Sequence, residues 1–215
     1  MMEQERTFCT IKEAMQICGV RSTQGFRSLL GSFGLLQKVN HTGTPFLSRA
    51  DMEVLGKIRP HLITKTDAGV MLGVSTGTAP RLLDLLCRAG HLQPFMAGPK
   101  PAQKTFRFLK QDIEKLKCDL EKRCRKEPAP WRAVSICSGG DNRVAARYLC
   151  QALLSGVLTE AWWNLKEMGL RGIRVSKAEA ERLSQMSWQR WESELKPLEA
   201  FVPSMEYWRE RAKDL

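Results

Sequence analysis

Three clusters of arginine, amide and hydroxyl side chains are the residues in this sequence whose types and spacing could do chemistry. In chain order the clusters are Arg21, Ser22, Thr23, Gln24 and Arg27; Ser75, Thr76, Thr78 and Arg81; and Asn142, Arg143 and Arg147. Arginine pairs in bidentate fashion with guanine, amides pair with adenine, and hydroxyls bond to phosphate. These residue types therefore predict contact with nucleic acid. For the hydroxyls at 22, 23, 75 and 76 the alternative is a structural role as helix N-caps.

The overall charge agrees with this expectation. The chain of 215 residues carries a net charge of +11 at pH 7, with a sequence pI near 9.6. Such a surplus favours polyanions, most commonly nucleic acid and less often an anionic membrane or an acidic protein. No apolar run approaches the roughly 20 residues that span a bilayer, and the N-terminus lacks the pattern of a signal peptide. We therefore expect a soluble, cytoplasmic protein.

Enzymatic chemistry has little support in the sequence. None of the three histidines, His41, His61 and His91, stands in a recognisable pattern with a nucleophile or an acid pair, and P-loop and GxSxG motifs are absent. The seven cysteines are scattered without a CxxC pair, so they predict neither a zinc ribbon nor a disulfide framework. The stretch CSGGDNR at 137–143 invites an active-site interpretation, but it is more typical of a turn before a capped helix. We expect no catalysis, no cofactor and no metal.

A repeated pattern predicts the elements that position the three clusters. Each unit ends in one shared phrase: LSRADMEVL at 47–55, FLKQDIEKL at 108–116 and VSKAEAERL at 175–183. A second shared phrase precedes it: GSFGLLQ at 31–37, CRAGHLQ at 87–93 and LLSGVLT at 153–159. The first two units also share their openings: TIKEAMQICGV at 10–20 and ITKTDAGVMLGV at 63–74. The third unit matches this opening only weakly.

The opening of a unit has the pattern of an N-capped helix. Thr10 precedes Glu13, and Thr64 or Thr66 precedes Asp67, which is the arrangement of a helix N-terminus with a nearby acid. Apolar residues then follow at helical spacing, which predicts one buried face.

A glycine turn is predicted to join this helix to a second one. Gly19 and Gly73 suit the left-handed conformation that often ends a helix. The second helices are predicted at 23–30, 78–88 and 142–154. Two short helices joined in this way form a helix-turn-helix, whose second helix enters the major groove with its N-terminal residues against the bases. The three clusters occupy those positions.

A β-hairpin wing is predicted after each second helix. Polar, glycine-rich stretches lie between strand-like residues at 40–45, 97–105 and 169–172. The phrase that ends each unit would then supply the second wing strand and the start of a closing helix. The second wing is the most basic, with Lys100, Lys104 and Arg107, and we expect it to follow the phosphate backbone or the minor groove. The alternative is a mobile, solvated loop.

The first unit resembles a known family. Its pattern, TIKEAMQICGV followed by GLLQ and FLSRADMEVL, is similar to the excisionase and MerR-type winged helix-turn-helix. The resemblance covers 10–58 and 63–123 well and 131–183 loosely. It implies a DNA-binding module of the kind found in regulators, phage proteins and transposition proteins. Tandem modules also suggest the C-terminal parts of TniQ- and TnsD-like transposition target selectors, although the cysteine-rich segment of that family is missing.

The predicted domains are module 1 at 8–59, module 2 at 60–127, module 3 at 131–184 and a Trp-rich helical extension at 185–215. All six tryptophans follow residue 130. Trp188 and Trp191 are spaced i, i+3, which predicts an aromatic stripe on a helix. We expect this stripe to dock onto module 3. The alternative is an exposed, partner-binding surface formed by Trp188, Trp191 and Trp208.

These observations predict a mainly α-helical protein of tandem winged helix-turn-helix modules with short hairpin wings and a C-terminal helical extension. The expected ligand is double-stranded DNA, in a mobile element, a phage or a transcriptional regulation system. The alternative is a protein-protein adaptor or RNA-binding scaffold, in which the basic surface has only sequence-blind affinity for nucleic acid.

Overall fold

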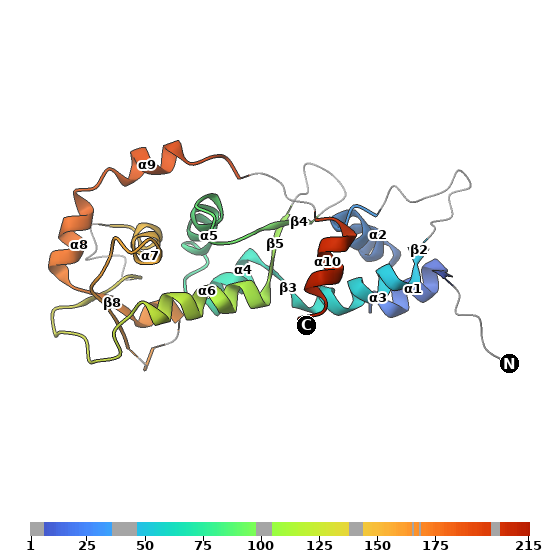
Figure 1. Ribbon diagram of the computed structural model, residues 1–215, viewed down its shortest axis with the longest axis horizontal. Coiled ribbons are helices and arrows are strands. Elements are labelled where there is room, and N and C mark those ends of the chain that lie inside the picture. Colours follow the sequence, from blue (N-terminus) through green and yellow to red (C-terminus); the bar gives the residue numbers. More distant parts are fainter. Residues whose placement is uncertain are drawn as a thin grey trace. The chain divides into compact units, whose positions relative to one another are not determined.

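The computed structural model in Figure 1 describes residues 7–35, 47–97, 105–137, 144–164, 166–167, 169–198 and 203–215. Within these ranges the chain forms ten α-helices and small antiparallel sheets, which confirms the expected mainly α class. The wing stretch at 40–45, Lys100, Lys104, Asn142 and Arg143 lie outside the described residues.

Module 1 contains two strands and three helices. They are β1 (Phe8–Cys9), α1 (Ile11–Ile17), α2 (Thr23–Ser32), β2 (Leu47–Ser48) and α3 (Arg49–Ile58). The Thr10 side chain accepts a hydrogen bond from Glu13 N, and the Glu13 carboxylate accepts one from Thr10 N, so the predicted N-cap is a capping box. Gly19 follows with φ +63° and turns the chain toward α2. Phe26 and Leu30 of α2 and Leu55 of α3 are buried in the small core.

Module 2 repeats this order of elements. It comprises β3 (Leu62–Thr64), α4 (Lys65–Met71), α5 (Ala79–Arg88), β4 (Phe95–Ala97), β5 (Thr105–Leu109) and α6 (Lys110–Lys122), and a short 3-10 turn, η1 (Arg59–His61), precedes it. Thr64 caps α4 in a second capping box with Asp67, and Gly73 has φ +68°. The predicted hairpin is present, since β4 pairs antiparallel with β5 and Phe95 lies opposite Arg107.

Module 3 keeps the strands and the closing helix. Its elements are β6 (Val134–Ser135), α7 (Ala146–Leu154), β7 (Ala161–Trp163), the 3-10 turn η3 (Gly169–Gly172), β8 (Ile173–Val175) and α8 (Lys177–Ser184). The described residues between β6 and α7, which are 136, 137, 144 and 145, are not helical. Helix α7 begins at Ala146 rather than at the predicted Asn142, so Arg147 lies in its first turn.

The phrase that ends each unit has the same structure in all three modules. In each case a strand leads directly into a helix: β2 into α3, β5 into α6 and β8 into α8. Ser48 and Ser176 cap the first and third of these helices through their hydroxyls. The strand before each closing helix is also hydrogen-bonded to the strand that opens its module. The strand orders in the three sheets are β1-β2, β3-β5-β4 and β6-β8-β7. The prediction of a strand followed by a closing helix is confirmed.

The compact units of the fold do not follow the predicted module boundaries. Unit 1 consists of 1–63, 94–107 and 200–215, and unit 2 consists of 64–93 and 108–199. The hairpin strand β4 therefore belongs to unit 1, where it packs against α2, whereas α4, α5 and α6 belong to unit 2. The C-terminal extension is divided as well: α9 (Trp188–Glu194) lies in unit 2 and α10 (Met205–Arg211) lies in unit 1.

In unit 1, Trp208 completes the core beside module 1. Helix α10 packs on α3, and the Trp208 ring, 1% exposed, lies 5.0 Å from the Phe33 ring and 4.8 Å from the Phe95 ring between centroids. Next to it, Arg209 donates to the buried Asp51 carboxylate at 2.7 Å. A partner-binding role for Trp208 on an exposed surface does not agree with this burial, since the chain's own aromatic residues surround the ring.

In unit 2, Trp188 docks onto module 3. Its ring stacks on Tyr148 of α7 with a centroid distance of 5.5 Å, and its Nε1 donates to the Leu183 carbonyl at 2.8 Å. Trp191 is half-buried and meets Trp188 edge-on. The stripe therefore lies against α7, as the self-docking interpretation expected, and buried Trp188 presents no exposed surface to a partner.

Candidate nucleic-acid interface

The N-terminal end of α2 is an exposed group of the predicted residue types. Arg21, Ser22, Thr23, Gln24 and Arg27 are all exposed. Ser22 is also the N-cap, because its hydroxyl accepts a hydrogen bond from Gly25 N at 3.0 Å. The structural interpretation of that hydroxyl is therefore correct, while its exposure leaves further hydrogen-bonding capacity.

Two arginines at this end have unengaged guanidinium groups. Within the described part of the chain, neither Arg21 nor Arg27 makes an ion pair or a side-chain hydrogen bond. Thr23 and Arg27 are four residues apart and Gln24 and Arg27 three apart, so they neighbour one another on the helix surface. The first backbone N–H groups of α2 add partial positive charge at the same end. The arrangement attracts an anion such as a phosphate and offers donors to base edges.

Arg59 stabilises the glycine turn that precedes α2. Its Nη1 donates to the carbonyls of Cys18 at 3.0 Å and Gly19 at 2.8 Å, and so ties the glycine turn to the end of α3. No motif in the sequence points to this residue. No local pattern could do so, because the bonded groups are 40 or more positions apart in the chain.

The corresponding end of α5 in module 2 is also exposed. The Ser75 hydroxyl accepts a hydrogen bond from Thr78 N at 3.3 Å and lies 2.9 Å from the Thr78 hydroxyl, so these two residues stabilise the entry to the helix. Thr76 and Arg81 are exposed, and Arg81 has no ion pair or side-chain hydrogen bond among the described residues. Module 2 therefore presents one unengaged arginine where module 1 presents two.

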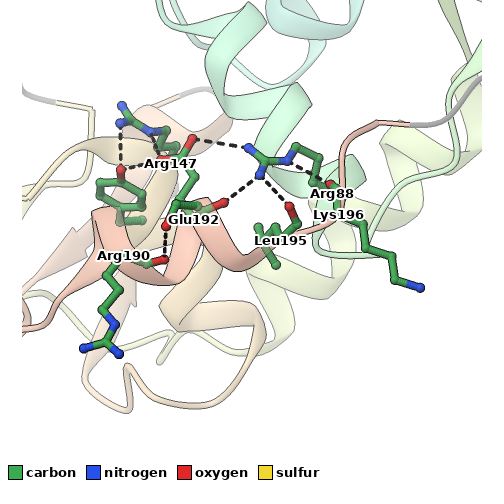
Figure 2. Close-up of polar contacts among 8 residues, drawn as sticks. Arg88, Arg147, Arg190, Glu192, Leu195 and Lys196 are labelled. Carbon is green, nitrogen blue, oxygen red and sulfur yellow. Dashed lines mark hydrogen bonds and ion pairs between the residues drawn. The ribbon is translucent and has the colours of Figure 1, made fainter.

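Module 3 does not present its second helix in this way. Residues 148–154 of α7 are all buried. Arg147, predicted to contact DNA, instead donates to Glu192 of α9 at 3.4 Å and to the Tyr148 hydroxyl at 2.8 Å (Figure 2). Tyr148 in turn donates to Glu192, and burial together with this bond raises the pKa of Tyr148. Arg147 thus holds α9 within the protein.

Arg88, at the end of α5, also binds α9, at and just beyond the C-terminal end of that helix. Its guanidinium donates to the carbonyls of Glu192 at 2.6 Å, Leu195 at 2.9 Å and Lys196 at 3.1 Å (Figure 2). The last carbonyls of a helix lack partners within that helix, and an arginine is well suited to satisfy them. No motif in the sequence points to this contact either, since Arg88 and the carbonyls it binds are more than 100 positions apart.

The second wing is described only in part. Arg107 on β5 is half-buried, and Lys100 and Lys104 lie outside the described residues. Because β4 packs against α2 in unit 1, the base of this hairpin supports the helix that carries Arg27 and that Arg21 precedes.

Apart from the exposed Cys118, the described cysteines are buried or half-buried, which makes them poorly suited to thiolate chemistry. Burial raises the pKa of Cys137, in the CSGGDNR stretch, to about 11, with Arg171 opposing the shift. A thiol with this pKa stays protonated at neutral pH and is a weak nucleophile. Burial likewise raises the pKa of other thiols: Cys18 to about 11, and Cys87 and Cys124 to about 12.

His91 and Gln151 of unit 2 each carry a buried polar atom. Nε2 of His91 and Oε1 of Gln151 are buried and have no hydrogen-bond partner in the described structure. Burial lowers the pKa of His91; the Gln151 side chain opposes this shift and Arg123 adds to it. The folded protein therefore holds His91 neutral at a pH where an unfolded histidine, with a pKa of about 6.5, begins to be protonated.

This shift predicts a loss of stability in weak acid. Because the folded pKa lies below the unfolded one, the unfolded state binds more protons as the pH falls below about 6.5, and the free energy of unfolding decreases. We expect the urea midpoint to fall between about pH 7.5 and 5.5 in the native chain. In His91→Gln this part of the dependence should vanish, while the matched His61→Gln variant should retain it. Equal pH profiles for all three proteins would contradict the assignment.

The described residues show neither a metal site nor a membrane-spanning helix. No cluster of three or more His, Cys, Asp and Glu side chains suited to a metal ion occurs among them. None of the helices within the described ranges has both the length and the apolar character needed to cross a membrane. Comparisons with protein-family models, curated proteins and solved structures find no match to this chain.

Proposed function

We propose that the chain is a double-stranded DNA-binding protein in which modules 1 and 2 act as winged helix-turn-helix modules. The observation that carries the proposal is the exposed end of α2, where Arg21 and Arg27 are unengaged beside Thr23 and Gln24. Helix α2 would be the recognition helix of module 1, and α5 with Arg81 would be that of module 2. The expected setting is a mobile element, a phage or a regulatory system.

Three further features support this proposal. The helix, glycine turn and helix in modules 1 and 2 are followed by a strand and a closing helix, which is the order of a winged helix-turn-helix. The chain is strongly basic, as a DNA-binding protein commonly is. Module 3 contributes packing rather than recognition in this proposal, because α7 is buried and Arg147 is bound to Glu192.

The decisive experiment selects binding sites from a randomised duplex library at near-physiological salt. An enriched site longer than one module can cover would show that modules 1 and 2 read DNA together. Enrichment of a short site would assign recognition to one module. Binding only at low salt, without enrichment, would contradict the proposal and favour the adaptor or RNA-binding alternative, because non-specific charge attraction weakens steeply as salt rises.

Substitution of Arg27 should weaken binding to the selected duplex. A bidentate base contact contributes about 1–3 kcal/mol, so Arg27→Ala should raise Kd by about 5- to 150-fold and relax the preference at one base position. Arg21→Ala should raise Kd too, either at one base position or, for a phosphate contact, uniformly across sequences. The measurement is fluorescence anisotropy with the selected site and with single-base variants of it.

The matched control is Arg190→Ala. The Arg190 side chain is 83% exposed on α9, and among the described residues it pairs only with Glu194 in the next turn, so its loss removes the same charge without touching α2 or α5. Its Kd should change little. Equal weakening by Arg27→Ala and Arg190→Ala would mean that only net charge matters, and the assignment of α2 would fail.

A further inference from the structure

Trp131 is an exposed tryptophan on the segment that follows α6. It is 85% exposed, more than any other large hydrophobic side chain of the described residues. The Arg132 guanidinium lies over one face of its ring at 4.3 Å from the centroid, while most of the indole surface remains open to solvent. A large aromatic side chain in this position contributes nothing to the core.

The segment that carries Trp131 is held in place by backbone bonds. Arg125 N donates to Ala161 O at 2.8 Å and Trp163 N donates to Arg125 O at 3.0 Å, which attaches the start of the segment to β7. After Trp131, Ala133 N donates to Pro130 O at 2.8 Å and β6 joins β8. Pro128 and Pro130 further restrict the backbone between these anchors. The backbone that carries the Trp131 ring is therefore held in place on both sides.

Cationic residues are concentrated near Trp131 in the sequence. Residues 122–132 contain five cationic side chains and one acidic one, Glu127. Lys122 pairs with Asp119 at 3.7 Å and Arg125 with Glu160 at 4.0 Å. Lys126 and Arg132 have no acidic partner among the described residues and are both exposed. The charge on this segment is thus incompletely neutralised beside an open aromatic ring.

We propose that the segment 122–132, here called the Trp131 platform, binds single-stranded nucleic acid. One unpaired base would stack on the open surface of Trp131, and Lys126 and Arg132 would meet the neighbouring phosphates. Aromatic stacking combined with cations along the backbone is the general means by which proteins hold single strands without reading sequence. This site lies in unit 2 and does not depend on recognition of a duplex by α2.

The test is fluorescence anisotropy with an oligothymidine of about 12 nucleotides, a length within the usual range for one binding site. Stacking of one base contributes about 1–3 kcal/mol, so Trp131→Ala should raise Kd by about 5- to 150-fold. Trp131→Phe should recover much of this loss, because an aromatic face remains. Lys126→Gln should weaken binding and flatten its dependence on salt.

The Trp131 variants are expected to fold, because the side chain is exposed and a surface substitution of this kind usually changes stability very little. Arg190→Gln is the control for charge and should leave oligothymidine affinity close to native. The proposal fails if the native chain does not bind oligothymidine, or if Trp131→Ala binds it as well as the native chain does. Equal loss on oligothymidine and on duplex would also overturn it, since stacking requires an unpaired base.

These outcomes separate the Trp131 platform from the proposed duplex function. Trp131→Ala should leave affinity for the selected duplex close to native, whereas Arg27→Ala should leave oligothymidine affinity close to native. Loss of one activity with retention of the other therefore tests each proposal independently. If Trp131→Ala leaves affinity for oligothymidine unchanged but weakens binding of an acidic peptide, the ligand of the platform is a protein and the assignment to nucleic acid is wrong.

Discussion

Replacing Trp208 with alanine is expected to lower the free energy of unfolding of unit 1 by about 3–5 kcal/mol, the usual range when a buried tryptophan is truncated. The ring lies between Phe33 and Phe95 and is 1% exposed, so its removal leaves a cavity at the end of α2 and beside β4. Hydrogen exchange should report the change, with faster exchange in α2 and α3 than in the helices of unit 2.

A phenylalanine at this position tests whether the effect comes from lost packing volume. Nε1 of Trp208 is buried without a hydrogen-bond partner in the described structure, so Trp208→Phe removes an unsatisfied donor and leaves a smaller cavity. Trp208→Phe should lower the free energy of unfolding much less than Trp208→Ala does. Trp191→Ala is the control for loss of an indole, because Trp191 is only half-buried and lies in unit 2. Uniform acceleration of exchange in both units by Trp208→Ala would contradict a local role.

Replacing Gly169 with alanine is the second change with a large expected effect. Gly169 has φ +60°, and a Cβ there would lie 2.6 Å from the carbonyl carbon of Leu72 and 2.8 Å from Gly73 N. The adjacent Leu170 N donates to Leu72 O at 2.7 Å, so this close approach joins module 3 to the turn of module 2 within unit 2. Left-handed strain of about 1–2 kcal/mol and overpacking of about 1–3 kcal/mol predict a total cost of about 2–5 kcal/mol.

Gly90 provides the matched control for this prediction. It also has a positive φ, +80°, but a Cβ there would meet nothing within 4 Å. Gly90→Ala should therefore cost only the conformational strain, about 1–2 kcal/mol. Urea unfolding of the two variants gives the difference. If the two variants lose the same free energy of unfolding, the approach of Gly169 to Leu72 does not constrain unit 2.

Much of the local structure could be predicted because each signal lies within a few residues of its effect. Thr10 and Thr64 cap helices whose acids stand three positions later, and Gly19 and Gly73 adopt the positive φ expected of a helix end. The exposed residues at the start of α2 follow from the same local pattern. Such features need no knowledge of the remaining chain.

The candidate site was less predictable, because availability of a side chain depends on what packs against it. Arg27 and Arg147 both stand near the start of a predicted recognition helix, yet Arg27 is exposed and Arg147 binds Glu192. The difference arises from α9, which lies against α7 of module 3. Helices α2 and α7 both carry an arginine near their starts, yet the start of α2 is exposed and Arg147 at the start of α7 is bound by α9.

The sequence by itself determined the mainly helical class, the capped helices, the glycine turns and the strand that leads into each closing helix. These depend on backbone conformation and on hydrogen bonds between near neighbours. Only the tertiary structure decided that Trp208 fills the core of unit 1, that Arg88 and Arg147 hold α9, and that β4 belongs with α2. Those contacts join distant segments by burying apolar surface and by supplying hydrogen bonds to carbonyl groups at helix ends. They therefore depend on how the whole chain packs.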